Sequence, residues 1–242
     1  MTSGQVFLNT IQCILVGALA MGLITRGRWR LCWSFTGYVT VNIVFGSMST
    51  IWPGRFYNHA TWIPYLAVID VLKVGIGLET GWRTFSAFPG AASAARHTAL
   101  LILAATLVAT ARVPVISPYF TSIQTTVLNL HPRAIDGAIW LMAAVLLIAR
   151  WYRVPADRFH SSILASLAVY ELFFSSLLRL FAGHDFESTR LFVNAVDGPV
   201  YILLTCWWIH VAWRADSAVD RLHVDTLRTL ERAAYLGRVS ST

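Results

Sequence analysis

Apolar residues fall into seven long runs along the chain, separated by short links that carry arginine, proline or glycine. Each run is close to the ~20 residues that an α-helix needs to cross a bilayer. Because a bilayer cannot hydrogen-bond an open backbone, the runs are predicted to be helices. The pattern therefore predicts an all-α fold, a bundle of seven transmembrane helices at about 6–24, 31–52, 61–83, 98–116, 134–151, 159–182 and 191–213.

The links between the runs differ in arginine content. Most arginines follow the first, third, fifth and seventh runs: Arg26, Arg28, Arg30, Arg83, Arg96, Arg150, Arg153, Arg158 and Arg214. Positive charge favours the cytoplasmic side of a membrane. We therefore expect the N-terminus outside and the C-terminus inside, and residues 117–133 are the longest expected loop.

The last part of the chain has a different pattern. Over 216–236, apolar residues recur at helical spacing between arginine and acidic residues. This predicts a cytoplasmic amphipathic helix, which lies on headgroups or docks a protein partner. We accordingly divide the chain into a membrane domain, 1–214, and a cytoplasmic tail, 215–242.

Composition agrees with a membrane protein. Hydrophobic residues make up 56% of the chain and charged residues 13%, whereas soluble domains carry about 25% charged residues. The net charge of +7 does not indicate nucleic-acid binding, because the arginines flank apolar runs. The first run lacks a signal-peptide pattern and is expected to stay in place. We expect an integral protein of a bacterial inner membrane, with the lipid bilayer as its main partner.

Charged residues inside the apolar runs mark the candidate site. Asp70 and Lys73 lie three residues apart on one helical face of the third run, and Lys73 is the only lysine. Intramembrane charges are costly, so they pair or line a pathway. Together with Asn42, Glu171 and Asp197, they predict a polar interior that opens toward the outer face. Closed ion pairs between helices and a ligand pocket or ion path both remain open.

Three histidines, His97, His160 and His210, are expected near the cytoplasmic ends of their helices. They could hold zinc or haem, but their spacing matches no metal motif, and interface histidines that reach the headgroups explain them as well. A retinal cofactor is not expected, because the only lysine lies on the third helix and Tyr201 stands one turn beyond Asp197.

Short motifs surround the third run: Tyr57-Asn-His-Ala-Thr-Trp62 before it, then Gly77-Leu-Glu-Thr-Gly-Trp-Arg-Thr-Phe85 and Phe88-Pro-Gly90. In these motifs and in the order of its runs, the chain resembles a group of uncharacterised bacterial seven-span membrane proteins. The resemblance implies a fold and a membrane location. It implies no activity and transfers no functional residue.

The sequence carries no recognisable catalytic motif. We therefore expect a non-enzymatic protein, either an accessory subunit of a larger membrane complex or a sensor-like ligand-binding bundle. Protein partners would use the bundle surface or the 216–236 helix. The alternatives are a transporter or proton-conducting protein that uses the intramembrane charges, and a metal- or haem-dependent membrane enzyme that uses the inner histidines.

Overall fold

The computed structural model describes residues 3–56, 58–86, 97, 122–151, 157–180, 186–214, 229 and 232. All regular structure in these ranges is helical, which confirms the all-α class. The elements are α1 (Ser3–Thr25), the short 3-10 turn η1 (Arg28–Arg30), α2 (Trp33–Ile51), α3 (Pro53–Phe56), α4 (His59–Ser86), α6 (Ser122–Trp151), α7 (Arg158–Leu180) and α8 (Phe186–Trp213).

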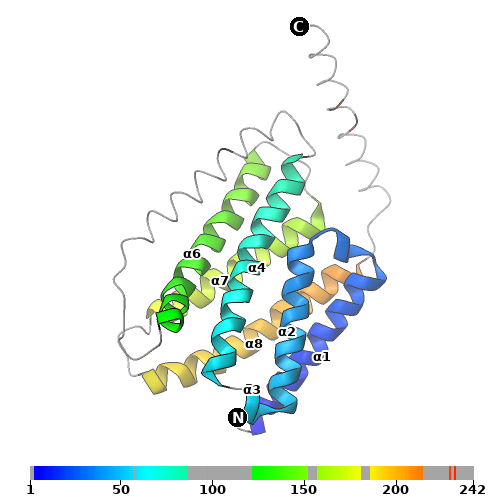
Figure 1. Ribbon diagram of the computed structural model, residues 1–242. Coiled ribbons are helices and arrows are strands. Elements are labelled where there is room, and N and C mark those ends of the chain that lie inside the picture. The colour runs from blue at the N-terminus through cyan, green and yellow to red at the C-terminus, as the bar shows by residue number, and fades with distance from the viewer. Residues whose placement is uncertain are drawn as a thin grey trace.

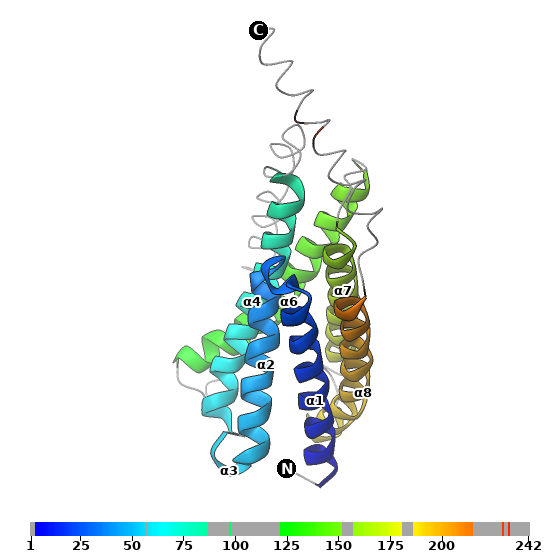
Figure 2. The same cartoon turned by 90° about the vertical axis from the view of Figure 1, so that its right-hand side faces the viewer.

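The long helices form a closed ring. Neighbours around the ring are α1 and α2, α2 and α4, α4 and α6, α6 and α7, α7 and α8, and finally α8 and α1. The helices α2 and α4 lie on one side of the ring, α7 and α8 on the other (Figures 1 and 2). Helices on opposite sides scarcely approach each other along their backbones, so long side chains fill the space between them.

The bundle has two distinct ends. The N-terminus, α3 and the starts of α4, α6 and α8 lie at one end, which we call the α3 end (Figure 1). The turn η1 lies at the opposite end, with the last residues of α1, α4, α6 and α8, and we call it the Arg28 end. The helices α4 and α6 run in the same direction, as the predicted third and fifth spans require.

Helix α6 corrects one prediction. The sequence pattern places residues 117–133 in a loop, but α6 begins at Ser122 and continues through Pro132. A proline inside a helix removes one hydrogen bond and strains the preceding turn. The stretch before it contains no glycine, and His131 bonds to Asp70 of α4, which holds this turn against the bundle. Likewise, α8 begins at Phe186, five residues before the predicted run.

Two predicted segments lie outside the described residues. These are the fourth run, 98–116, and almost all of the tail, of which only Thr229 and Arg232 are described. The division at residue 214 and the amphipathic tail helix therefore stay predictions.

The bundle surface is apolar and its interior is partly polar, the reverse of a soluble protein. Four described helices contain stretches long and apolar enough to cross a membrane: Val6–Thr25, Ala60–Thr84, Leu130–Trp151 and Ala195–Trp213. Large apolar side chains such as Val71, Leu147 and Trp151 are exposed, whereas Asp70, Lys73 and Glu171 are buried. Lipid would cover such a surface at little cost.

Small residues allow α4 to approach its neighbours closely. A Cβ atom added to Gly77 would lie 2.8 Å from Leu141 Cδ2 of α6, and one added to Gly81 would lie 3.0 Å from Val145 Cγ2. Such contacts are typical of helix pairs in membranes. They fix the face that α4 turns into the ring, and this face carries Asp70 and Lys73.

Candidate functional site

The predicted site residues all lie on helices that border the ring interior. Asn42 is on α2, Asp70 and Lys73 are on α4, Glu171 is on α7, and Asp197 is on α8. Lys73 lies halfway along α4 and Glu171 lies a little past the middle of α7. The prediction of a polar interior made from these helices agrees with their placement.

Lys73 and Glu171 form an ion pair across the ring. The Lys73 Nζ atom lies 2.8 Å from Glu171 Oε1, and the Glu171 side chain is 0% exposed. Neither carboxylate oxygen of Glu171 has a well-directed hydrogen bond from any described residue. The partner of Lys73 is thus Glu171, and the expectation that Asp70 would pair with it on the same helix is wrong.

Asp70 pairs with a histidine that the sequence analysis missed. The Nδ1 atom of His131 lies 2.7 Å from Asp70 Oδ2, and the second oxygen, Oδ1, is buried without a hydrogen-bond partner among the described residues. His131 falls within the segment 117–133, which the sequence pattern places in a loop. The sequence did contain a signal for this residue: His131 lies three residues before the apolar run 134–151. Because helices in membranes tolerate proline, that helix could extend back through Pro132 to include it.

Tyrosines supply the remaining polar contacts in the interior. The Tyr170 hydroxyl donates to Asp197 Oδ1 over 2.8 Å, and the Tyr65 hydroxyl donates to Asn42 Oδ1 over 2.9 Å. The hydroxyls of Tyr38 and Tyr201 lie 3.4 Å apart. Sequence reasoning took these rings as apolar, because a tyrosine contributes to an apolar run like any aromatic residue.

A net negative charge results from this arrangement. We define the interior cluster as Asp70, Lys73, His131, Glu171 and Asp197; Asp197 lies within the electrostatic influence of Lys73. Three carboxylates thus face one lysine and one histidine. Arg133, two residues after His131 on α6, is half-buried and has a contact of its own. Within the five residues of the cluster, the carboxylates exceed the basic groups by one even with His131 charged.

A polar stripe connects Glu171 with the α3 end. Glu171, Ser175 and Arg179 follow one another at intervals of four residues on α7, so they share one face. The Ser175 hydroxyl donates to Asp136 Oδ1 of α6 over 3.2 Å. The Nη2 atom of Arg179 lies 2.7 and 2.6 Å from the two Asp136 oxygens. We call these residues, with Asp136, the α7 stripe.

Toward the Arg28 end the interior becomes apolar. Five large side chains there are at most 2% exposed, and we call them the dry layer: Phe35, Ile76, Met142, Leu167 and Trp208. The rings of Phe35 and Trp208 meet edge to face, with centroids 5.2 Å apart. Protein interiors packed in this way leave no room for a water file. The interior cluster is therefore separated from the Arg28 end.

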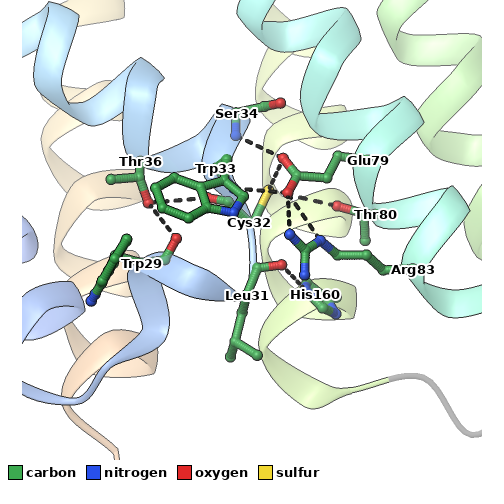
Figure 3. Close-up of polar contacts among 10 residues, drawn as sticks. All are labelled: Trp29, Leu31, Cys32, Trp33, Ser34, Thr36, Glu79, Thr80, Arg83 and His160. Atoms are coloured by element: carbon green, nitrogen blue, oxygen red, sulfur yellow. Dashed lines mark hydrogen bonds and ion pairs between the residues drawn. The ribbon is translucent and has the colours of Figure 1, made fainter.

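Beyond the dry layer, Glu79 caps the start of α2 (Figure 3). Its Oε1 atom accepts the backbone N–H of Trp33 over 2.9 Å, and its Oε2 atom accepts that of Ser34 over 2.7 Å. Arg83 Nε donates to Oε1 over 2.9 Å, and the two residues form an ion pair one helical turn apart on α4. A carboxylate at a helix N-terminus is favourable because it meets unpaired N–H groups.

Other side chains at the Arg28 end also bind the backbone at helix ends. The guanidinium of the buried Arg28 donates to the Val211 and Arg214 carbonyls at the end of α8. Cys32 lies in the link between α1 and α2, and its burial raises the pKa of the thiol from 9.0 to about 11, with the Glu79 charge adding to the effect. These contacts join helix ends, and the Cys32 Sγ atom lies 3.7 Å from Glu79 Oε2 (Figure 3).

The candidate histidines do not converge. The Nε2 atom of His160 lies 2.8 Å from the Leu31 carbonyl (Figure 3), while His97 and His210 are exposed. Among the described residues, no group of three or more His, Cys, Asp or Glu side chains is placed to hold a metal ion. The described geometry therefore adds no support for zinc or haem at these histidines, and that alternative stays a prediction.

Comparisons with known proteins add no further assignment. No protein-family model, no curated protein and no solved structure matches the chain. The class that the fold and the site define is a helical bundle with four membrane-span-like helices and a charged interior. The functional argument therefore rests on the residues of the interior cluster.

Proposed function

We propose that this chain is a non-enzymatic, multi-span membrane protein of the sensor-like kind, in which the interior cluster takes up and releases a proton. Seven spans with the N-terminus outside are part of the proposal. The parallel direction of α4 and α6, and the arginines at the Arg28 end, support this topology. An inner-membrane location in a bacterium also remains part of it.

The carboxylate excess of the interior cluster carries the proposal. Three carboxylates around Lys73 and His131 leave at least one unbalanced negative charge in a low-dielectric interior, and such a charge is costly. A bound proton removes it. Glu171 is the best-placed acceptor, because it is 0% exposed and its oxygens lack directed hydrogen bonds.

Protonation would change the forces that hold the ring together. With Glu171 charged, its ion pair with Lys73 draws α4 and α7 together across the interior. With Glu171 neutral, that attraction is lost, and Asp197 of α8 is the carboxylate that remains within the electrostatic influence of Lys73. The two protonation states thus favour different helix arrangements, and a sensor needs such a two-state element.

The dry layer favours sensing over conduction. A proton conductor needs polar groups or water along its whole length, whereas Ile76, Met142 and Leu167, next to the interior cluster on the side of the Arg28 end, are apolar and at most 2% exposed. The transporter alternative requires a second conformation that opens this layer. The accessory-subunit alternative needs a partner on the apolar surface, and it remains a prediction.

Infrared difference spectroscopy tests the proposal. The purified protein, reconstituted in lipid, is titrated while the carbonyl stretch of protonated carboxylic acids is recorded. We expect one buried carboxyl band that responds to pH and is absent in Glu171→Gln. The matched control is Glu79→Gln, which alters a carboxylate beyond the dry layer and keeps the band. A Glu171 band that does not change with pH would refute the proposal.

A proton-flux assay on the same proteoliposomes separates the two membrane functions. A sensor shows no flux above that of protein-free vesicles at any pH where the band titrates. Flux that Lys73→Ala abolishes would replace the sensor proposal with the conducting alternative.

A further inference from the structure

The charged groups nearest to Glu171 lie in one half of the bundle. Asp70, His131, Asp136, Ser175 and Asp197 all lie between the middle of the ring and the α3 end. The other half holds the dry layer and neutral polar contacts, such as the hydrogen bond from Trp208 Nε1 to the Ser166 hydroxyl over 2.8 Å. The interior cluster therefore has charged neighbours toward the α3 end.

Exposure rises steadily along the α7 stripe. Glu171 is 0% exposed, Ser175 is 8% exposed, and the Arg179 side chain is 69% exposed. Asp136 lies beside the last two and accepts hydrogen bonds from both. The stripe is thus a continuous series of polar side chains from the α3 end to the buried carboxylate.

We propose that Glu171 exchanges protons with water only at the α3 end, along the stripe formed by Arg179, Asp136 and Ser175. This inference rests on the proposed function, since it concerns the route to the same carboxylate. Asp136 takes the proton from water, and the hydroxyl of Ser175 accepts it while releasing its own proton toward Glu171. Ser175 and Glu171 are one helical turn apart, about 5–6 Å, a distance that one water molecule bridges.

Arg179 positions the first group of this route. Its Nη2 atom lies 2.7 and 2.6 Å from the two Asp136 oxygens, which holds the carboxylate beside the Ser175 hydroxyl. Arg179 is accordingly a positioning residue, and Glu171 is the group that stores the proton.

Several other charged and titratable groups surround Glu171, and the route must be distinguished from their effects. They are Tyr38 of α2, Asp70 and Lys73 of α4, His131 of α6, Tyr170 of α7, and Asp197 and Tyr201 of α8. In the part of the chain that the structure describes, the α7 stripe leads by hydrogen bonds from the exposed Arg179 through Asp136 to Ser175, one helical turn short of Glu171. Variants of the stripe leave all of these groups in place.

Cysteine accessibility tests the sidedness of the route. Ser175→Cys and Leu172→Cys are made in a protein in which Cys13, Cys32 and Cys206 are replaced by alanine. Proteoliposomes are treated with a charged, membrane-impermeant methanethiosulfonate from one side at a time. We expect Ser175→Cys to react from the α3 side alone, although Ser175 is buried. Leu172→Cys is the lipid-facing control beside Glu171, 56% exposed, and should not react.

Kinetics of the Glu171 carboxyl band test the route itself. After a pH jump, Asp136→Asn and Ser175→Ala should slow the appearance of the band by at least about tenfold. Thr205→Val is the matched control, because it removes a buried hydroxyl that lies off the stripe; its rate should equal that of the unmodified protein.

The two proposals fail in different ways. A Glu171 band that never titrates refutes the proposed function. A band that titrates at unchanged rates in Asp136→Asn and Ser175→Ala refutes only the route, as does reaction of Ser175→Cys from the Arg28 side.

Discussion

Lys73 on α4 and Glu171 on α7 are joined by a 2.8 Å contact across the interior of the helix ring. The backbones of α4 and α7 scarcely approach each other. The ion pair therefore joins two helices that are not neighbours in the ring, whereas neighbouring helices pack directly against each other. Neither oxygen of Glu171 has a directed hydrogen bond from the residues that the structure describes. Loss of either residue would therefore leave the other charge buried without its ion-pair partner.

Removing one member of this pair should be far worse than removing both. Lys73→Ala leaves a buried carboxylate unpaired, and we expect a loss of about 3–5 kcal/mol. The double variant Lys73→Met with Glu171→Leu keeps volume without charge and should be about as stable as the parent. Chemical denaturation in lipid-detergent micelles measures the free energy of unfolding of the parent, Lys73→Ala and the double variant.

The same double variant also separates stability from function. If the charges only hold helices together, the apolar pair should preserve every property of the protein. We expect instead a stable bundle that has lost the pH-dependent carboxyl band. Equal destabilisation in the single and double variants would contradict the ion-pair interpretation.

The sequence predicted the described helices well where apolar runs had clear ends. The run at 31–52 corresponds to α2 (Trp33–Ile51), because its flanking Arg-rich turn and Pro-Gly step end any helix. Pro132 lies inside α6 and does not end the helix. His131 was missed as a site residue because the segment 117–133 was predicted to be a loop. The choice of Glu171 over Asp70 as the partner of Lys73 could not be predicted, since it depends on which faces α4 and α7 turn inward.

Glu79 should stabilise the Arg28 end as a helix cap. Glu79→Ala removes the acceptor for two backbone N–H groups at the start of α2, and we expect a loss of about 1–2 kcal/mol. Glu79→Gln keeps an acceptor oxygen and should lose less. Thermal melting in micelles ranks the variants, and a Gln variant weaker than the Ala variant would contradict the cap.

Gly77 should tolerate no side chain, whereas Gly17 should. A Cβ atom at Gly77 would lie 2.8 Å from Leu141 Cδ2, and Leu141 is itself buried, so Gly77→Ala should cost about 1–3 kcal/mol. Nothing lies within 4 Å of a Cβ atom at Gly17 in α1. Gly17→Ala should be neutral or stabilise by up to about 1 kcal/mol. Melting temperatures of the two variants should shift in opposite directions.

Cys32 should react slowly and should make the fold sensitive to alkaline pH. Because burial raises the pKa of the thiol from 9.0 to about 11, its thiolate fraction at neutral pH is about 100-fold below that of an unfolded chain. Iodoacetamide labelling of a variant with Cys32 as its one cysteine measures this. Labelling should accelerate sharply on denaturation, beyond what the gain in thiolate alone gives, since the folded thiol is also 2% exposed.

The same raised pKa has a consequence for stability. Between pH 9.0 and about 11 the folded state keeps the thiol proton that the unfolded state has lost, so the free energy of unfolding falls as pH rises through this window. Cys32→Ala removes the group and should flatten this part of the pH profile relative to the parent. A parent profile with the same slope as Cys32→Ala would show that the thiol titrates alike in both states, against the burial seen here.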